Sequence, residues 1–232
     1  MRINKYLAQA GFGSRRKCEE FILQGLVKVN GKVVSDLSTQ ILESDKVEVD
    51  NKKIESLSKY KYYKFYKPKG YVCTKEENEP FSIFNLLPLD PTLTYIGRLD
   101  KESEGLLLIS NDGRLTYKLT HPKFHKEKVY FVRVDRPITS GEIQQLRNGV
   151  IIDGVKTLPA EVEQLSNRGF NITLTEGRNR QIRKMCRKLG LRVHKLRRDQ
   201  VGKIKLEDIN PGEYQELSKE ELNYIKTLNE QN

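Results

Sequence analysis

The sequence predicts an α+β fold in which a small domain precedes a larger one. Segments with β character outnumber helical segments along the 232 residues, and the two kinds do not alternate strictly, which argues against a doubly wound sheet. The sequence also has no internal repeat and no Gly-x-Gly-x-x-Gly or P-loop motif, so a nucleotide cofactor is not expected. We therefore expect a mixed sheet with helices packed against it.

The first domain is predicted at residues 1–50. A helix begins near Ile3 and ends before the Gly-Phe-Gly turn at 11–13, and Ser14 is a typical N-cap for a second helix. Residues 27–34 alternate in polarity around an Asn-Gly turn, which predicts a hairpin, and 46–49 continue the sheet. Two helices and a small sheet indicate a compact module.

The second domain is expected at 60–232, after a polar linker at 51–59 that lacks hydrophobic periodicity. Strands are predicted at about 60–67, 95–96, 106–109, 129–134, 150–152, 170–174, 193–196, 203–206 and 214–217, and helices at about 114–119, 141–147, 179–189 and 220–228. In the segment 60–67, lysines alternate with aromatic residues. We expect the aromatic side chains to pack inward and the lysines to face solvent, with stacking of the aromatics on bases as the alternative.

Positive charge is concentrated in one part of the chain. The net charge is +11, and residues 176–205 alone hold twelve Lys and Arg against two acidic residues. A basic patch of this density indicates a polyanionic partner. A membrane surface is the weaker alternative because the patch has few bulky apolar residues and no long apolar face.

Composition also limits the compartment and the cofactors. The three cysteines are far apart and odd in number, which favours a reducing cytoplasm, and neither a signal peptide nor a transmembrane span is predicted. His121 and His125 have a plausible spacing for metal ligands, but no further ligand pair accompanies them. We therefore expect no metal and no membrane partner.

A polar loop between two apolar segments carries the candidate chemistry. Arg98 and Asp100 follow a short apolar run and precede the run Leu106 to Ile109, so both charges are expected at a strand end. A surface turn with solvated charges is the alternative.

The front of the chain resembles the S4 RNA-binding domain in three motifs: Arg2-Ile3-Asn4-Lys5-Tyr6-Leu7, Ser14-Arg15-Arg16 and Val27-Lys28-Val29-Asn30-Gly31. The resemblance implies that RNA is contacted by the basic side chains of this module, namely Arg2, Lys5, Arg15, Arg16 and Lys17. Three cations at a helix start oppose the helix dipole and need compensation, which also favours contact with phosphate. A solvated helix start is the alternative.

The rest of the chain resembles RNA pseudouridine synthases, in particular the RsuA/RluB/RluF branch that acts on ribosomal RNA. The matching motifs are Gly97-Arg98-Leu99-Asp100 with Ser103, Gly105 and Leu106-Leu107-Leu108, and Lys67-Pro68-Lys69-Gly70 at the domain start. The resemblance implies a largely antiparallel mixed sheet and the isomerisation of a uridine without any cofactor.

Family motifs also assign roles to individual residues. Asp100 matches the catalytic acid, Tyr130 a tyrosine that stacks on the target base, and Arg183 a basic residue paired with the acid. Arg98 matches a position that holds the substrate nucleotide outside the stack, and Leu174 an apolar residue under the base. The alternatives are a packing tyrosine, one more charge on a basic helix, and a core leucine.

Ribosomal RNA is the expected partner of a monomeric, cytoplasmic enzyme. Additional RNA contacts are expected from Arg178, Asn179, Arg180 and Arg187 in the basic patch. Lys101 and the motifs at 134–139 and 179–186 favour the 23S RNA of the large subunit, while 16S RNA and tRNA remain alternatives. A non-catalytic, ribosome-associated S4 protein is the rival class; an S4 RNA methyltransferase would need a Gly-rich cofactor loop that the sequence lacks.

Overall fold

A computed structural model describes residues 1–54, 59–76, 78–87 and 90–230. The chain divides into two compact units, each of which is described by itself. The first comprises residues 1–61 with the short segments 89–94 and 110–112, and the second comprises the remainder.

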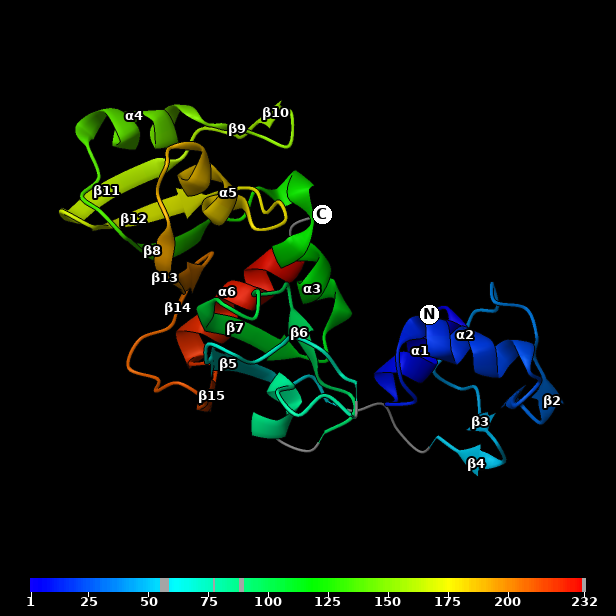
Figure 1. Cartoon of the computed structure of the whole chain (residues 1–232). Coiled ribbons are helices and arrows are strands. Elements are labelled where there is room, and N and C mark those ends of the chain that lie inside the picture. The colour runs from blue at the N-terminus through cyan, green and yellow to red at the C-terminus, as the bar shows by residue number, and fades with distance from the viewer. Residues whose placement is uncertain (55–58, 77, 88–89, 231–232) are drawn as a thin grey trace. The chain divides into compact units, whose positions relative to one another are not determined.

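The first unit is built of two helices and a small antiparallel sheet, drawn in blue and cyan in Figure 1. Its elements are α1 (Ile3–Gln9), α2 (Arg15–Leu23), β1 (Val27–Val29), β2 (Lys32–Val33), β3 (Val47–Val49) and β4 (Lys52–Lys53), with the strand order β2-β1-β3-β4. Ile3, Leu7 and Ile22 are fully buried in its core. The hydroxyl of Ser14 accepts a hydrogen bond from the Lys17 amide at 3.2 Å, so Ser14 is the N-cap of α2 as predicted.

Strand β4 lies inside the segment predicted as a linker. Glu48 of β3 is the partner of Lys53, and Val49 is the partner of Lys52, so the first unit's sheet extends past residue 50. The middle of the predicted linker, residues 55–58, lies outside the described residues. The exact domain boundary remains a prediction.

In the second unit, nine strands of the described residues form one mixed sheet. Seven of them follow the path β11-β12-β8-β13-β7-β5-β15, while β14 pairs with β13 and β6 pairs with β7. The strands are β5 (Tyr62–Lys67), β6 (Thr94–Ile96), β7 (Glu104–Ser110), β8 (Lys128–Val134), β11 (Glu161–Ser166), β12 (Gly169–Leu174), β13 (Val193–Val201), β14 (Ile204–Lys205) and β15 (Tyr214–Glu216). A separate hairpin is formed by β9 (Ile151–Ile152) and β10 (Val155–Lys156). The pairing of β13 with β7 is parallel, whereas β13 pairs antiparallel with β8, which confirms the predicted mixed, largely antiparallel sheet.

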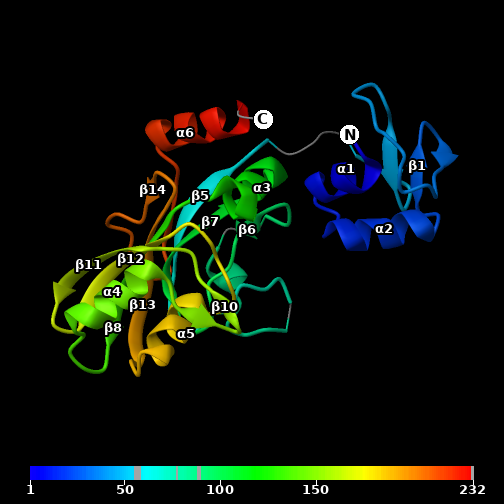
Figure 2. The same cartoon turned by 90° about the horizontal axis from the view of Figure 1, so that it is seen from above.

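Helices cover this sheet at two places, as Figures 1 and 2 show. The helical elements are η1 (Ile83–Leu86), α3 (Gly113–Thr120), η2 (Pro122–Phe124), α4 (Ser140–Asn148), α5 (Gln181–Lys188) and α6 (Lys219–Glu230). Helices α4 and α5 share a core with β8 and β12, where Phe170 and Met185 are fully buried. Helices α3 and α6 share a second core with β5 and β7, around Leu106 and Leu108. None of the helices in the described part of the chain has the length and apolar character of a membrane span.

The structure corrects the predicted orientation of the lysines in β5. Lys64 and Lys67 are buried together with the neighbouring Phe65, although they were expected to face solvent. Lys64 is accommodated by ion pairs with Glu207 and Glu221. Strand β11 was not predicted because nearly all of its side chains are exposed, so its sequence lacks the alternation of a half-buried strand.

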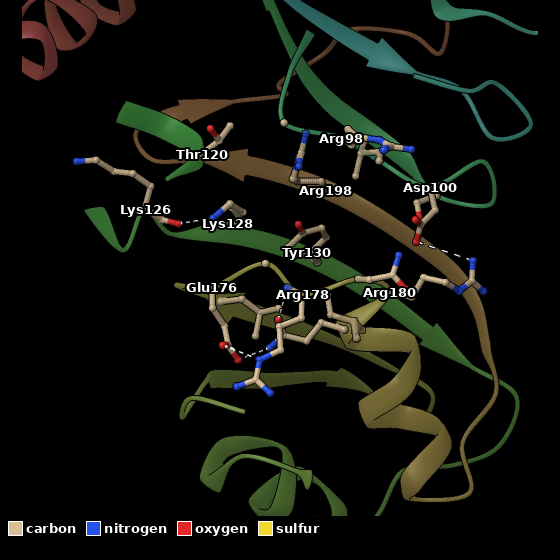
Figure 3. A pocket seen from close by; sticks show the side chains of 18 of the residues that line it. Arg98, Asp100, Thr120, Lys126, Lys128, Tyr130, Glu176, Arg178, Arg180 and Arg198 are labelled. Atoms are coloured by element: carbon tan, nitrogen blue, oxygen red, sulfur yellow. Dashed lines mark hydrogen bonds and ion pairs between the residues drawn. The ribbon is translucent and has the colours of Figure 1, made fainter. Parts of the chain in front are cut away.

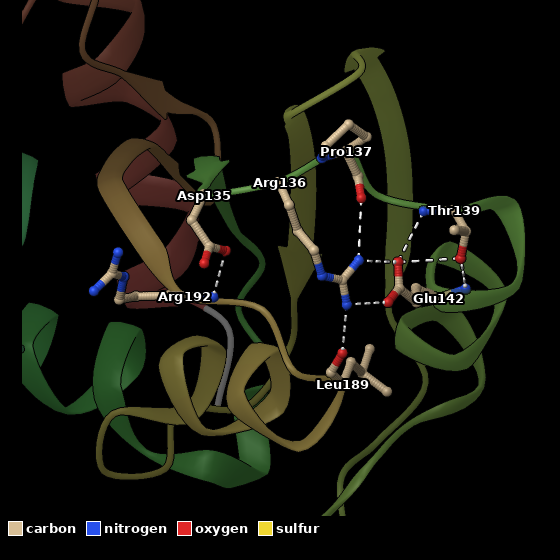
Figure 4. Close-up of polar contacts among 7 residues, drawn as sticks. All are labelled: Asp135, Arg136, Pro137, Thr139, Glu142, Leu189 and Arg192. Atoms are coloured by element: carbon tan, nitrogen blue, oxygen red, sulfur yellow. Dashed lines mark hydrogen bonds and ion pairs between the residues drawn. The ribbon is translucent and has the colours of Figure 1, made fainter.

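The C-terminal end of α5 is fastened to the segment between β8 and α4, as Figure 4 shows. The Arg136 guanidinium donates at 2.6 Å to the Glu142 carboxylate and at 3.0 Å to the carbonyl oxygen of Leu189, just after α5. The bond from Arg136, with those from Thr139, holds the pKa of Glu142 at about 2. Glu142 and Thr139 also form a capping box at the start of α4. The C-terminal end of α5 is thereby linked, through Arg136, to the start of α4.

Two residues restrain the β6–β7 loop, which carries Asp100. The Nζ of Lys67, a fully buried side chain, donates at 2.7 Å to the Ser103 carbonyl oxygen. At the start of β7, Gly105 has φ +103°, and a Cβ there would collide with the main chain of Arg198. Only glycine therefore allows β7 to approach β13 this closely.

Gly105→Ala is expected to lower the free energy of unfolding by roughly 3 kcal/mol, because backbone strain and overpacking add at this position. The matched control is Gly154→Ala, where φ is +78° but no atom lies within 4 Å of the added methyl group. Chemical denaturation of both variants separates the collision from the strain. Equal losses in the two variants would show that the approach of β7 to β13 tolerates a side chain.

Lys67 is expected to make stability rise with pH above neutrality. Burial lowers its pKa from 10.5 to about 8 in the folded state. Above pH 8 the folded protein loses this proton while the unfolded chain keeps it until about pH 10.4, so the unfolded state binds more protons. Between pH 8 and pH 10 the buried lysine becomes neutral in the folded protein, so its desolvation cost disappears and the free energy of unfolding rises.

The measurement is the difference in free energy of unfolding between wild type and Lys67→Met across that pH range. This difference should shift in favour of wild type as pH rises. Lys69→Met, which removes an exposed lysine on the same segment, provides the matched control. A pH-independent difference between wild type and Lys67→Met would contradict the buried ammonium group.

Candidate active site

The β6–β7 loop forms one wall of a cavity of about 460 Å³, shown in Figure 3. The other walls come from the connection between α3 and β8, the end of β12, the start of α5, and β13. This volume falls within the range of sites that bind small organic groups. All of these segments belong to the second unit.

Asp100 lies at the rim of this cavity, in a turn closed by a 3.0 Å bond from the Ser103 amide to its carbonyl oxygen. The side chain is 34% exposed, and Arg180 Nη1 lies 3.9 Å from Asp100 Oδ2. Figure 3 shows this long contact as a dashed line. An ion pair so open to solvent contributes at most about 1 kcal/mol, so the carboxylate remains available to a ligand.

The predicted ion pair between Arg183 and Asp100 is not formed among the described residues. Arg183 instead donates from Nη2 to the Glu102 carbonyl oxygen at 2.7 Å, and from Nη1 to the Val193 carbonyl oxygen at 3.2 Å. Burial, followed by the charge of Arg180, lowers the pKa of Arg183, while Asp100 acts in the opposite direction. Arg183 therefore ties the loop that carries Asp100 to β13, and Arg180 supplies the charge nearest to the acid.

Tyr130 and Leu174 lie on neighbouring strands of the sheet and line the same cavity. In the register of β8 and β12, Tyr130 is opposite Ile172 and Lys128 is opposite Leu174, so all four side chains share one face. Tyr130 is half-buried, and Leu174 is buried and also belongs to the core. With Arg98 at the rim, the structure brings together four of the five residues predicted to act on the substrate.

The predicted RNA-contacting residues fall into three groups. Arg180 and Asn179 line the cavity, whereas Arg187 is exposed on α5 and does not. Arg178 also lines the cavity, but it bonds to the Glu176 carboxylate at 3.1 Å and to the carbonyl oxygens of residues 155 and 156. Of the residues predicted in the first unit, Arg2, Arg15, Arg16 and Lys17 are exposed, and Lys5 is half-buried.

Three basic residues of the cavity, Lys126, Lys128 and Arg198, were not predicted. Arg198 on β13 is only 4% exposed and donates from Nε to the Leu106 carbonyl oxygen at 2.8 Å. Lys128 on β8 also lines the cavity, and burial, with the charge of Arg198, lowers its pKa. In the sequence Arg198 and Lys128 belong to stretches rich in basic residues. Only the register of their strands could have distinguished them from the other basic residues of those stretches.

The arrangement suits an anionic ligand that carries a flat ring. The cavity offers an aromatic and an aliphatic wall, an accessible carboxylate, and basic side chains in excess over acidic ones. A carboxylate in this setting can act as a nucleophile, as a base, or as a stabiliser of positive charge. In the described residues, no group of three or more His, Cys, Asp or Glu side chains has the geometry to hold a metal ion.

Comparisons with known proteins agree with this site. The family model described as RNA pseudouridylate synthase matches residues 61–188, and the S4 domain model matches residues 1–47. Ribosomal large subunit pseudouridine synthase B of Bacillus subtilis is 35% identical over 98% of this chain and 96% of its own length. The dual-specificity RNA pseudouridine synthase RluF of Escherichia coli is 37% identical over 96% of this chain and 77% of its own.

The fold comparison gives the same result. A solved structure described as a pseudouridylate synthase is 30% identical and has a TM-score of 0.72, covering 97% of this chain and 99% of its own. The resemblance to the branch that includes RluB and RluF is thereby confirmed. The chain belongs to the RNA pseudouridine synthase family and carries an S4 RNA-binding domain in front of its catalytic domain.

Proposed function

We propose that the enzyme isomerises one uridine of ribosomal RNA, with the 23S RNA of the large subunit as the favoured substrate. The observation that carries this proposal is the accessible carboxylate of Asp100 at the rim of a cavity whose walls include Tyr130 and Leu174. The target uracil would lie against these two side chains, with its ribose toward Asp100. Arg98 would hold the nucleotide at the rim.

The reaction breaks the bond between uracil N1 and ribose C1′, rotates the base, and joins C1′ to C5. No electrons or groups are exchanged with another molecule, so the residues of the chain suffice in principle. Asp100 would stabilise or attack the electron-poor C1′, and Tyr130 would support the base and carry a proton. Arg183 would act through the loop, because its hydrogen bond to Glu102 sets the position of Asp100.

Binding must supply the free energy for removing the base from its stack, which is a few kcal/mol. Phosphate contacts of the exposed basic residues in both units are the source of this free energy. Ribosomal RNA offers such bases in loops and bulges, where the cost is lowest.

The choice of substrate rests on the relatives and on sequence motifs. RluB is named for the large ribosomal subunit, and RluF is named as a dual-specificity enzyme. Lys101 and the motifs at 134–139 and 179–186 favour the same branch, while 16S RNA and tRNA remain the alternative substrates. A non-catalytic S4 protein of the ribosome is the rival function, and it requires no carboxylate at position 100.

We further propose that the S4 domain ends near residue 50, that 51–59 join it to the catalytic domain at 60–232, and that the enzyme acts as a cytoplasmic monomer. A ribosomal RNA substrate is consistent with that compartment.

Asp100→Asn is expected to abolish pseudouridine formation while RNA binding is retained, because the amide keeps the shape of the side chain but loses its charge and nucleophilicity. Product is measured by mapping pseudouridine in rRNA from cells that lack the enzyme, after incubation with purified protein. Asp208→Asn, an exposed acid outside the cavity, is the matched control and should remain active. Turnover by Asp100→Asn close to that of the control would exclude the proposed chemistry.

A variant with both Arg15→Gln and Arg16→Gln is expected to bind rRNA more weakly and with less salt dependence. If each arginine neutralises one phosphate, the slope of log affinity against log salt should fall by about two. The control changes Lys52 and Lys53, two exposed lysines on β4, to Gln. An unchanged slope in the arginine variant would mean that the start of α2 is a solvated helix end.

A further inference from the structure

Arg198 is a desolvated cation that lacks most of its hydrogen-bond partners. Its side chain lines the cavity, yet the residue is only 4% exposed. Among the described residues, Nε is its only nitrogen with a partner, the Leu106 carbonyl oxygen, and Nη2 is buried without any. A guanidinium group has five N–H donors, and leaving buried donors unpaired costs free energy that a ligand can recover.

The strand register places Arg198 beside the residue on which the base would lie. Arg198 of β13 is directly opposite Tyr130 of β8, and on its other side it is opposite Gly105 of β7. Opposite residues of paired strands point to the same face, so the side chains of Arg198 and Tyr130 both line the cavity (Figure 3), with the guanidinium Nε bonded to Leu106 of β7. A flat ring that stacks on Tyr130 therefore presents its edge to Arg198.

The charge of Arg198 is not compensated by an acid at this end of the cavity. Arg198 has no ion pair among the described residues, and the second basic group on the floor, Lys128, donates to the Lys126 carbonyl oxygen at 2.8 Å. The two acids that line the cavity are engaged elsewhere: Asp100 faces Arg180, and Glu176 bonds Arg178 and Gln181. The site is thus prepared for negative charge that the substrate itself develops.

Such a charge arises in the reaction. When the N1–C1′ bond breaks, its electron pair remains on uracil, and the negative charge is shared between N1, C5 and the carbonyl oxygens O2 and O4. When C5 then bonds to C1′, that electron pair is used again and the C5 proton leaves, so the product ring is neutral. A fixed donor aimed at a carbonyl oxygen stabilises the intermediate more than it stabilises neutral uridine.

We propose that Arg198 is a catalytic residue that donates a hydrogen bond to a carbonyl oxygen of the detached uracil and stabilises its negative charge. Its role is to donate this hydrogen bond and not to transfer a proton. The inference rests on the proposed function. In that reaction the Asp100 carboxylate serves the sugar, and Arg198 supplies a hydrogen-bond donor for the base.

The first test is the rate of a single turnover at saturating RNA. Arg198→Met is expected to lower this rate roughly 100-fold, as for the loss of one donor to an oxyanion, with RNA affinity little changed. Arg197→Met is the matched control, because this neighbour points to the opposite face and pairs with Asp199 at 2.6 Å outside the cavity. Thermal unfolding of each variant reports whether the fold is preserved.

The deciding test combines the variants with altered substrates. RNA with 2-thiouridine or 4-thiouridine at the target replaces one carbonyl oxygen with sulfur, a weaker acceptor. If Arg198 bonds that oxygen, one of the two substitutions should change the rate differently in wild type and in Arg198→Met, by at least about tenfold. In Arg197→Met the substitution should act as it does in wild type.

Other outcomes overturn the proposal. Thio effects that are equal in wild type and Arg198→Met would mean that Arg198 is structural or bonds only trapped water. Coupling to a methylphosphonate beside the target, instead of to sulfur, would make Arg198 a phosphate ligand. Wild-type rates that change with neither sulfur substitution would also overturn the proposal. If Arg198→Met does not fold, Arg198→Lys replaces it in the same cycle. Failure of the proposed function is distinct, because wild type itself would then form no pseudouridine.

Discussion

The parallel pairing of β7 with β13 is the constraint on which the active site depends. It sets Gly105 beside Arg198, and the antiparallel pairing of β13 with β8 sets Arg198 beside Tyr130. Three segments far apart in the chain thereby supply the acid's loop, the buried cation and the aromatic surface. Because Gly105 has no side chain, β7 can lie directly against β13 just after the loop that carries Asp100 ends.

The close packing of β7, β13 and β8 also makes the site costly in folding free energy. Ser103 Oγ, Arg183 Nε and Arg198 Nη2 are buried without a hydrogen-bond partner among the described residues. Ser103 and Arg198 line the cavity, and Arg183 bonds the loop that carries Asp100. Lys67, whose pKa burial lowers to about 8, supports that loop from below. Unpaired polar groups in a folded protein concentrate where binding or catalysis needs them, so their gathering here is an argument for function that is independent of any motif.

The sequence was sufficient for the fold class and for the loop at Asp100, because hydrophobic periodicity and a local motif are both visible in one dimension. It was insufficient where partners are distant. The burial of Lys64 depends on Glu207 and Glu221, more than 140 positions away, and without them a lysine in a strand is expected to face solvent. The ion pair expected between Arg183 and Asp100 was wrong for a similar reason, since helix α5 starts one residue after Arg180 and aims Arg183 at carbonyl oxygens.

The basic stretch at 176–205 shows why net charge alone overstates contact with RNA. Arg178 uses its donors on Glu176 and two main-chain carbonyl oxygens, Arg183 uses two donors on further carbonyl oxygens, and Arg180 faces an acid. Arg187 is exposed, and Arg198 is buried in the cavity. A guanidinium group can brace a loop, orient a carboxylate or meet a ligand, and its donors cannot serve two of these tasks at once. The structure thus divides one uniform charge run into arginines whose donors are used within the protein and a small set of cations that remain free for the nucleotide.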